Sequence, residues 1–107
     1  MAFVYLLCDS GQDNCFKIGV AKKSIEKRKK QLQTGNCSEI FLSDYHETDY
    51  PYYIEKMLHQ KHYPEKKIGE WFELTTESVI NFKKECEELE KLIENMKDNP
   101  FFIKYLK

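Results

Sequence analysis

The sequence predicts an α+β fold in which a small three-stranded antiparallel sheet is flanked by helices. Short apolar runs that are rich in β-branched and aromatic residues alternate with longer segments of helical periodicity. The first two apolar runs are separated only by a segment of turn-forming residues, which is typical of an antiparallel hairpin. Together these observations predict the order β-β-α-β-α-(β)-α, which belongs to the α+β layer structures.

Three runs of the sequence are predicted to form the strands. In chain order they are residues 2–8 (AFVYLLC), residues 15–20 (CFKIGV) and residues 39–46 (EIFLSDYH). Residues 9–14 (DSGQDN) are dense in turn formers, so we expect a hairpin with a longer loop. Residues 70–74 (EWFEL) are a further short extended piece, and we expect a loop over residues 64–69 before it.

Three segments are predicted to be helical. In chain order they span residues 24–33, about 51–62 and about 75–96. Ser24 is a suitable N-cap for the first helix, and Pro51 stands in the first turn of the second, where its missing N–H costs little. Asn99 and Pro100 end the third helix, and an aromatic tail follows.

Length and composition indicate one folded domain. A chain of 107 residues fits a single domain, and an aromatic content of 14% argues against disorder. No apolar run approaches the roughly 20 residues of a membrane span, and no signal peptide is recognisable, so we expect a cytoplasmic protein without a membrane partner. We expect residues 1–82 to form the functional part and residues 83–107 to add an acidic helix and the aromatic tail.

Basic residues gather in one segment, although the net charge is only −1. Residues 17–30 contain seven basic side chains and one acid, which suits an anionic partner on one face; a solvated helix flank is the alternative. Arg28 is the only arginine of the chain. A guanidinium offers phosphate a planar, charged fork that an ammonium lacks, so Arg28 is either a phosphate ligand or an arginine whose stem covers the edge of the core.

Three further features are candidates for a site. Glu55, His59 and His62 share one stripe of the second helix, which indicates either a solvated polar face or a divalent-cation site. Gly19 lies inside a strand, where a glycine suggests the close approach of a ligand or of another part of the chain. Tyr5 on the neighbouring strand is either packed in the sheet or part of the same site.

The motifs together resemble the GIY-YIG nuclease superfamily, and most closely its short phage- and virus-type branch. The resemblance covers about residues 2–82. In chain order the motifs are Val4-Tyr5, Lys17-Ile18-Gly19, Arg28 to Leu32, Glu55 to His59, and Gly69-Glu70-Trp71-Phe72. Phe3 replaces the glycine of the founding motif, Lys17 stands at its second tyrosine, and Leu32 stands where the family has a histidine.

The resemblance implies a metal-dependent DNA endonuclease that nicks or cleaves phosphodiester bonds with Mg²⁺ or Mn²⁺. It implies that Glu55 holds the metal, that Arg28 binds the phosphate, and that Tyr5 orients or deprotonates the attacking water. Lys17 would assist catalysis by lowering the pKa of Tyr5 together with Arg28. The lysines expected to bind DNA are Lys22, Lys23, Lys27 and Lys30. The supporting residues expected at the site are Gly19, His59, Glu70 and Trp71.

Two other functions stay open. The first is a non-catalytic nucleic-acid-binding module on the same fold. The second is a zinc-binding structural protein that uses Glu55, His59 and His62. If the chain is a nuclease, cutting both strands needs two active sites, so we expect a homodimer or successive nicks. The branch resemblance also suggests a viral or phage setting.

Overall fold

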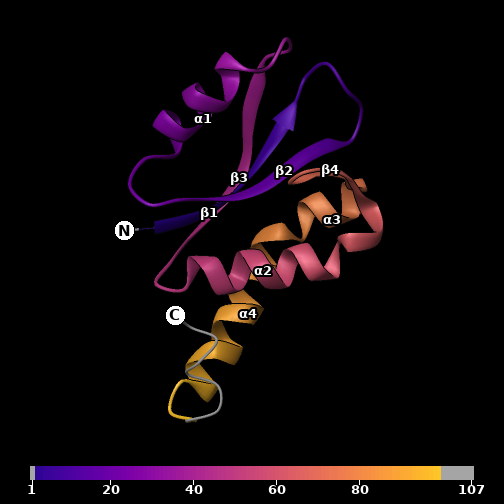
Figure 1. The fold of residues 1–107 in the computed structure, drawn as a ribbon. Helices are drawn as coiled ribbons and strands as arrows, with labels where there is room; N and C mark the ends of the chain where they lie inside the picture. The colour runs from indigo at the N-terminus through magenta and orange to yellow at the C-terminus, as the bar shows by residue number, and fades with distance from the viewer. Residues whose placement is uncertain (1, 100–107) are drawn as a thin grey trace.

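A five-stranded antiparallel sheet forms the centre of the computed structural model, which describes residues 2–99 (Figure 1). The strand order is β3-β1-β2-β5-β4. The strands are β1 (Ala2–Asp9), β2 (Cys15–Ala21), β3 (Ile40–Thr48), β4 (Lys66–Ile68) and β5 (Trp71–Glu73). The α+β class and the antiparallel sheet are therefore confirmed, but the predicted number of three strands is wrong.

The additional edge strand lies inside the predicted loop over residues 64–69. β4 and β5 form a tight hairpin whose turn contains Gly69 at a φ of 58°, a conformation that glycine adopts without strain. Every residue of β4 is exposed, and only Ile68 is apolar. A three-residue, solvent-facing strand shows no alternation of apolar and polar residues, so its sequence cannot be distinguished from a loop.

The helices are α1 (Ile25–Thr34), α2 (Pro51–Lys61), α3 (Thr76–Ile80) and α4 (Phe82–Met96), with a short 3₁₀ helix η1 (Tyr63–Glu65) after α2. Ser24 caps α1 as predicted, because its side chain accepts a hydrogen bond from the Lys27 N–H. The single helix predicted over residues 75–96 is wrong, because Asn81 divides it at φ −85° and ψ 0°. The predicted aromatic tail lies outside the described residues.

The two faces of the sheet have separate apolar cores. Figure 1 shows α1 on one side of the sheet and α2, α3 and α4 on the other. Side chains alternate along β1, so that Val4 and Leu6 pack with α2 and α4, whereas Tyr5 and Leu7 lie in the cluster beside α1. All four are at most 1% exposed. The face beside α1 therefore carries Tyr5, and the opposite face carries α2.

Helix α4 packs with its apolar side toward the sheet. Phe82, Cys86 and Ile93 are buried in the core on the α2 side of the sheet, and the helix contacts both β3 and α2. Across residues 2–99, no helix combines the length and apolar character that a bilayer crossing requires.

Candidate functional site

The candidate site lies at the edge of β2, beyond the point where β5 stops pairing with this strand. β5 pairs with β2 only from Cys15 to Lys17, and no other described strand pairs with β2 on that side. The backbone of Ile18 marks the end of this pairing. Its N–H donates to the Glu70 carbonyl at 3.4 Å, and its carbonyl accepts from Nε2 of His59 at 2.9 Å. Helix α2 and the segment before β5 therefore both contact β2 at Ile18.

The histidine bond also defines how His59 is protonated. A carbonyl oxygen only accepts hydrogen bonds, so Nε2 of His59 must carry the hydrogen. Nδ1 then remains able to accept a hydrogen bond or to bind a metal ion. The ring is held further by Phe72, which meets it edge-on at a centroid distance of 5.0 Å.

Tyr5 reaches the site from the face of the sheet beside α1. It pairs with Gly19 across the hairpin and is only 1% exposed. Its hydroxyl oxygen is buried and makes no hydrogen bond of good geometry among the described residues, although the Arg28 guanidinium lies close enough to act as a donor to it. Such an orphaned hydroxyl is costly, so it marks a place where a water or a substrate oxygen would be stabilised.

The pKa of Tyr5 differs from the sequence-based expectation. Burial raises it above the ordinary value, and the nearby carboxylates Glu70 and Glu55 raise it further, whereas Arg28 lowers it. The net direction is upward. The expectation that neighbouring cations would make Tyr5 a better base is therefore wrong, because desolvation of the phenolate outweighs the attraction of the guanidinium.

Arg28 lies on the rim of α1 and is partly buried. Its charge lowers the pKa values of both Tyr5 and Glu55, so the guanidinium lies close enough to act on both groups. The polar contact that Arg28 makes is a 3.3 Å hydrogen bond from Nη1 to Gln31 on the same helix. Gln31 is neutral, and the interactions of Arg28 with Tyr5 and Glu55 place its charge beside the candidate metal ligands, where it suits an incoming phosphate.

Lys17 is held between two residues of the Gly69–Phe72 segment. Its side-chain nitrogen lies 3.0 Å from Oε1 of Glu70 and 5.6 Å from the ring centroid of Trp71. Lys17 is only 7% exposed, so the carboxylate and the ring replace the water that its charge has lost. Lys17 also lowers the pKa of Glu55.

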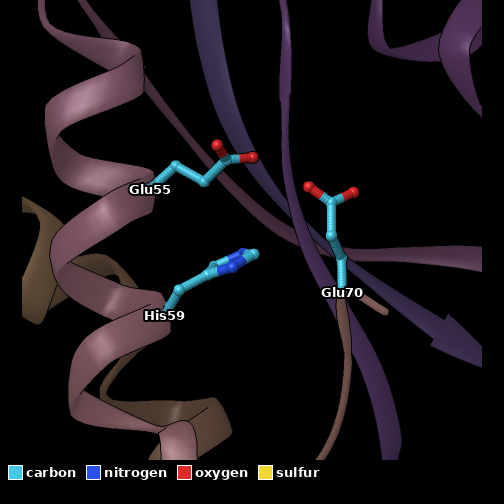
Figure 2. Close-up of side chains that lie close together, drawn as sticks. All are labelled: Glu55, His59 and Glu70. Carbon is cyan, nitrogen blue, oxygen red and sulfur yellow. The ribbon is translucent and has the colours of Figure 1, made fainter. Parts of the chain in front are cut away.

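Glu55, His59 and Glu70 form the one group of candidate metal ligands among the described residues (Figure 2). One ligand atom from each residue lies within 4.8 Å of the other two. Figure 2 shows Glu55 and His59 pointing from α2 toward Glu70, which approaches from the opposite side. The spacing of four residues puts Glu55 and His59 on the same side of the helix, one turn apart.

The carboxylate of Glu55 is strongly affected by its surroundings. Burial and the neighbouring Glu70 raise the pKa of Glu55 to about 7, although Lys17 and Arg28 oppose this shift. Two carboxylates at such close range are stable only when a proton or a cation is shared between them. The donor set of two carboxylates and one imidazole fits Mn²⁺, and the carboxylates alone fit Mg²⁺.

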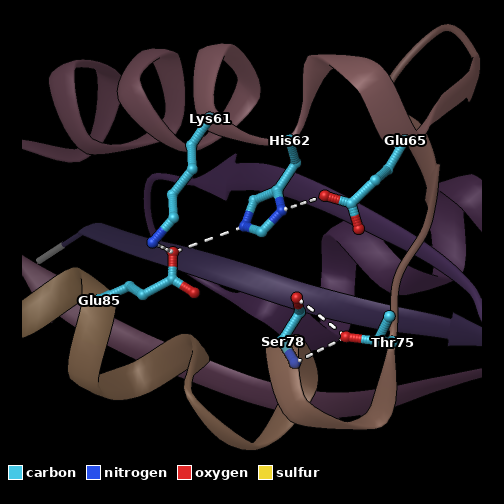
Figure 3. Close-up of polar contacts among 6 residues, drawn as sticks. All are labelled: Lys61, His62, Glu65, Thr75, Ser78 and Glu85. Atoms are coloured by element: carbon cyan, nitrogen blue, oxygen red, sulfur yellow. Dashed lines mark hydrogen bonds and ion pairs between the residues drawn. The ribbon is translucent and has the colours of Figure 1, made fainter.

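His62 lies outside this group, so the predicted zinc site with Glu55, His59 and His62 is wrong. His62 ends α2 and is 6% exposed. Its Nδ1 lies 3.0 Å from Glu65, and its Nε2 lies 3.5 Å from Glu85 (Figure 3). Seven residues bring His62 back to the direction of Glu55, but they separate the two by about 10 Å along the helix axis.

The expected DNA-binding lysines lie between the end of β2 and the middle of α1. Lys22 and Lys23 follow β2, and Lys27 and Lys30 lie on α1; all four are exposed. Lys29 is instead paired with Glu26 at 3.5 Å. The sequence predicted Glu70 only as a supporting residue, and no spacing signal places it opposite Glu55. That placement depends on the pairing of β5 with β2.

A family model for the T5orf172 domain matches residues 2–97. The chain belongs to the T5orf172 domain family. This family comprises nuclease-like, DNA-binding domains related to phage and bacterial modules. No curated protein and no solved structure gives a significant match.

The T5orf172 match corrects the resemblance to the GIY-YIG superfamily, which is a different family. The motifs that carried the resemblance are only two to five residues long. Three of them depart from the family pattern, at Phe3, Lys17 and Leu32. Motifs this short can occur together in more than one family.

Proposed function

We propose that this T5orf172 domain is a metal-dependent endonuclease that hydrolyses phosphodiester bonds of DNA. The proposal rests on one observation, which is that side chains of different chemical types lie together at the open edge of β2. A phenol, a guanidinium and a carboxylate interact there, and the carboxylate belongs to a cluster of metal-ligand type. A binding module needs the basic side chains but has no need for two crowded carboxylates beside them.

Glu55, Glu70 and His59 are the residues that would hold the cation. When bound, Mg²⁺ or Mn²⁺ would neutralise charge on the phosphate and stabilise the leaving oxygen. The raised pKa of Glu55 supports this assignment, because a cation relieves the same repulsion that now favours the proton. Lys17 keeps Glu70 in position through their 3.0 Å contact.

Arg28 and Tyr5 would act on the substrate itself. Arg28 would brace the non-bridging phosphate oxygens, because its guanidinium is a planar, permanently charged fork close to Tyr5 and Glu55. Tyr5 keeps its proton at neutral pH, because its pKa is raised. It would therefore orient the attacking water with its hydroxyl and would not remove a proton from that water.

Each chain would supply one such site. A single site breaks one strand at a time, so double-strand cleavage would require a homodimer or two successive nicks. Plasmid nicking separates these outcomes, since successive nicks produce the open-circular form before the linear form.

The test is a nicking assay on supercoiled DNA with Mg²⁺, with Mn²⁺ and with EDTA. We expect open-circular product with either metal, none with EDTA, and loss of product for Glu55→Ala and Arg28→Ala. Lys84→Ala is the matched control, because Lys84 is an exposed cation on α4. A protein that retards DNA in a gel but never cuts it with either metal would be the non-catalytic binding module instead.

A further inference from the structure

Two exposed tyrosines flank the Glu55–His59–Glu70 group along α2. Tyr52 is 56% exposed and Tyr63 is 68% exposed, so both rings are accessible to a ligand. Tyr52, Glu55, His59 and Tyr63 recur every three or four residues, so they follow one side of α2 and its continuation into η1. The acidic group therefore has an accessible aromatic ring on each side.

Each of these rings has a lysine beside it from another part of the chain. The Lys22 side-chain nitrogen lies 5.8 Å from the ring centroid of Tyr52, and that of Lys66 lies 5.9 Å from the centroid of Tyr63. Lys22 follows β2 and Lys66 begins β4. Lys56, also exposed, lies between the two tyrosines on α2. This surface thus alternates aromatic rings with positive charges.

The surface is hollowed at both rings. Tyr63 lines an open hollow of about 590 Å³ together with Glu55, Lys56 and His59. Tyr52 lines a second hollow of about 370 Å³, to which Lys22 also contributes. The first hollow contains two of the candidate metal ligands, so whatever lies against Tyr63 is adjacent to the site of the proposed chemistry.

We propose that the chain binds DNA as a single strand along α2, with unpaired bases stacked on Tyr52 and Tyr63. This inference rests on the proposed endonuclease function and names its substrate class. Bases of a duplex are stacked on one another, so a protein ring cannot cover their faces without disrupting the helix. An exposed ring can stack on one unpaired base, and the adjacent cation can contact the phosphate of that nucleotide. Such stacking is largely independent of the base sequence.

The spacing of the two rings agrees with a short single strand. Eleven residues separate Tyr52 from Tyr63, which is about 16 Å of helix. At roughly 3.4 Å per nucleotide along one stacked strand, this distance covers about five steps. The phosphate next to Glu55 would therefore lie between two stacked bases, in a strand that is unpaired over this length.

Tyr45 provides a matched control for the two tyrosines. It is 43% exposed, and the Lys83 side-chain nitrogen lies 4.9 Å from its ring centroid. It lies on β3, however, and β1 separates β3 from the open edge of β2. Its ring also packs edge-on against Phe3 at 5.9 Å. Tyr45 therefore combines an exposed ring with a nearby cation, as Tyr52 and Tyr63 do, but it lies away from the candidate site.

The experiment measures binding by fluorescence anisotropy in EDTA, so that cleavage does not contribute. The probes are a labelled single-stranded oligonucleotide and a duplex of the same sequence. We expect the single strand to bind more tightly, and Tyr52→Ala and Tyr63→Ala each to weaken that binding roughly ten-fold or more. Tyr52→Phe, Tyr63→Phe and Tyr45→Ala should stay within about two-fold of the parent. Thermal unfolding checks that every variant is folded.

Two results would overturn the inference: duplex binding as tight as single-strand binding, or parental affinity in both alanine variants. Nicking with Mn²⁺, measured in parallel, reports on the endonuclease function separately. A protein that nicks DNA but fails the anisotropy test loses only the single-strand inference. A protein that passes the anisotropy test but never cuts retains the stacking surface and loses the catalytic proposal.

Discussion

The ring of Tyr5 lies directly over Gly19 on the neighbouring strand. A Cβ at Gly19 would lie 2.6 Å from Cζ of Tyr5, closer than real Cβ contacts allow. Tyr5 is 1% exposed and cannot turn aside without moving its neighbours. The glycine in β2 is therefore explained by the close approach of a side chain, and it determines where the Tyr5 hydroxyl lies in the candidate site.

Gly19→Ala should destabilise the protein and misplace Tyr5. The added methyl group must displace a buried ring, which typically costs about 1–3 kcal/mol of unfolding free energy. We expect a lower Tm and weaker nicking. Gly35→Ala is the matched control, because a Cβ at Gly35 meets nothing within 4 Å. If the two variants unfold at the same temperature, Tyr5 does not constrain Gly19.

Tyr5→Phe should lower the nicking rate without lowering the stability of the protein. The Tyr5 hydroxyl is buried without a hydrogen bond of good geometry among the described residues, so its removal relieves a desolvation cost of about 1 kcal/mol. We expect an unfolding free energy in urea at or above that of the parent, together with a nicking rate at least ten-fold lower. Parental nicking by Tyr5→Phe would mean that the hydroxyl takes no part in hydrolysis.

Glu55 should make the metal-free protein less stable as the pH rises from about 5 to 7. Its pKa is about 7 in the fold and lies near 4.5 ordinarily, so the folded state holds a proton that the unfolded state releases. Stability from this group is present below pH 4.5 and is lost by pH 7. Allowing for partial exposure, we expect a loss of about 1–2 kcal/mol.

Thermal unfolding in EDTA at several pH values measures this effect. The slope of Tm between pH 5 and pH 7 should be shallower in Glu55→Gln, which cannot ionise. A Glu55→Gln variant with the parental slope would show that another group causes the pH dependence.

Metal binding should require Glu55 and Glu70 and should tolerate loss of His62. Calorimetric titration with Mn²⁺ should give at least ten-fold weaker binding for Glu55→Ala and for Glu70→Ala, because each supplies a carboxylate to the group. His62→Ala should bind Mn²⁺ as the parent does, because His62 contacts Glu65 and Glu85 instead. Loss of binding in His62→Ala alone would contradict this assignment of ligands.

The hairpin could be predicted from the sequence because local signals agree there. Residues 2–8 are apolar, residues 9–14 favour turns, and the pairing of Tyr5 with Gly19 follows from that hairpin. Likewise, the helical periodicity of α1 alone is enough to predict that Arg28 lies on the rim of this helix. Strand β4 and the division at Asn81 could not be predicted, because a three-residue polar edge strand and a single helical break leave no periodic signal.

The position of Glu70 could not be predicted either. Glu70 reaches Glu55 only because the β4–β5 hairpin folds back on β2, a contact between residues far apart in the chain. The same limit explains the wrong zinc site, since a helical wheel gives direction but omits the axial distance between Glu55 and His62. Local pattern therefore identified most of the residues, and tertiary pairing decided which of them meet.

The most direct test of this account is the initial rate of plasmid nicking with Mn²⁺ by the parent, Arg28→Ala and Lys84→Ala. Removing a group that stabilises transition-state charge typically costs about 10²–10³ in rate. We predict a loss of that order for Arg28→Ala and a parental rate for Lys84→Ala. Equal rates for Arg28→Ala and the parent would contradict the claim that the Tyr5, Arg28 and Glu55 side chains act on one phosphate.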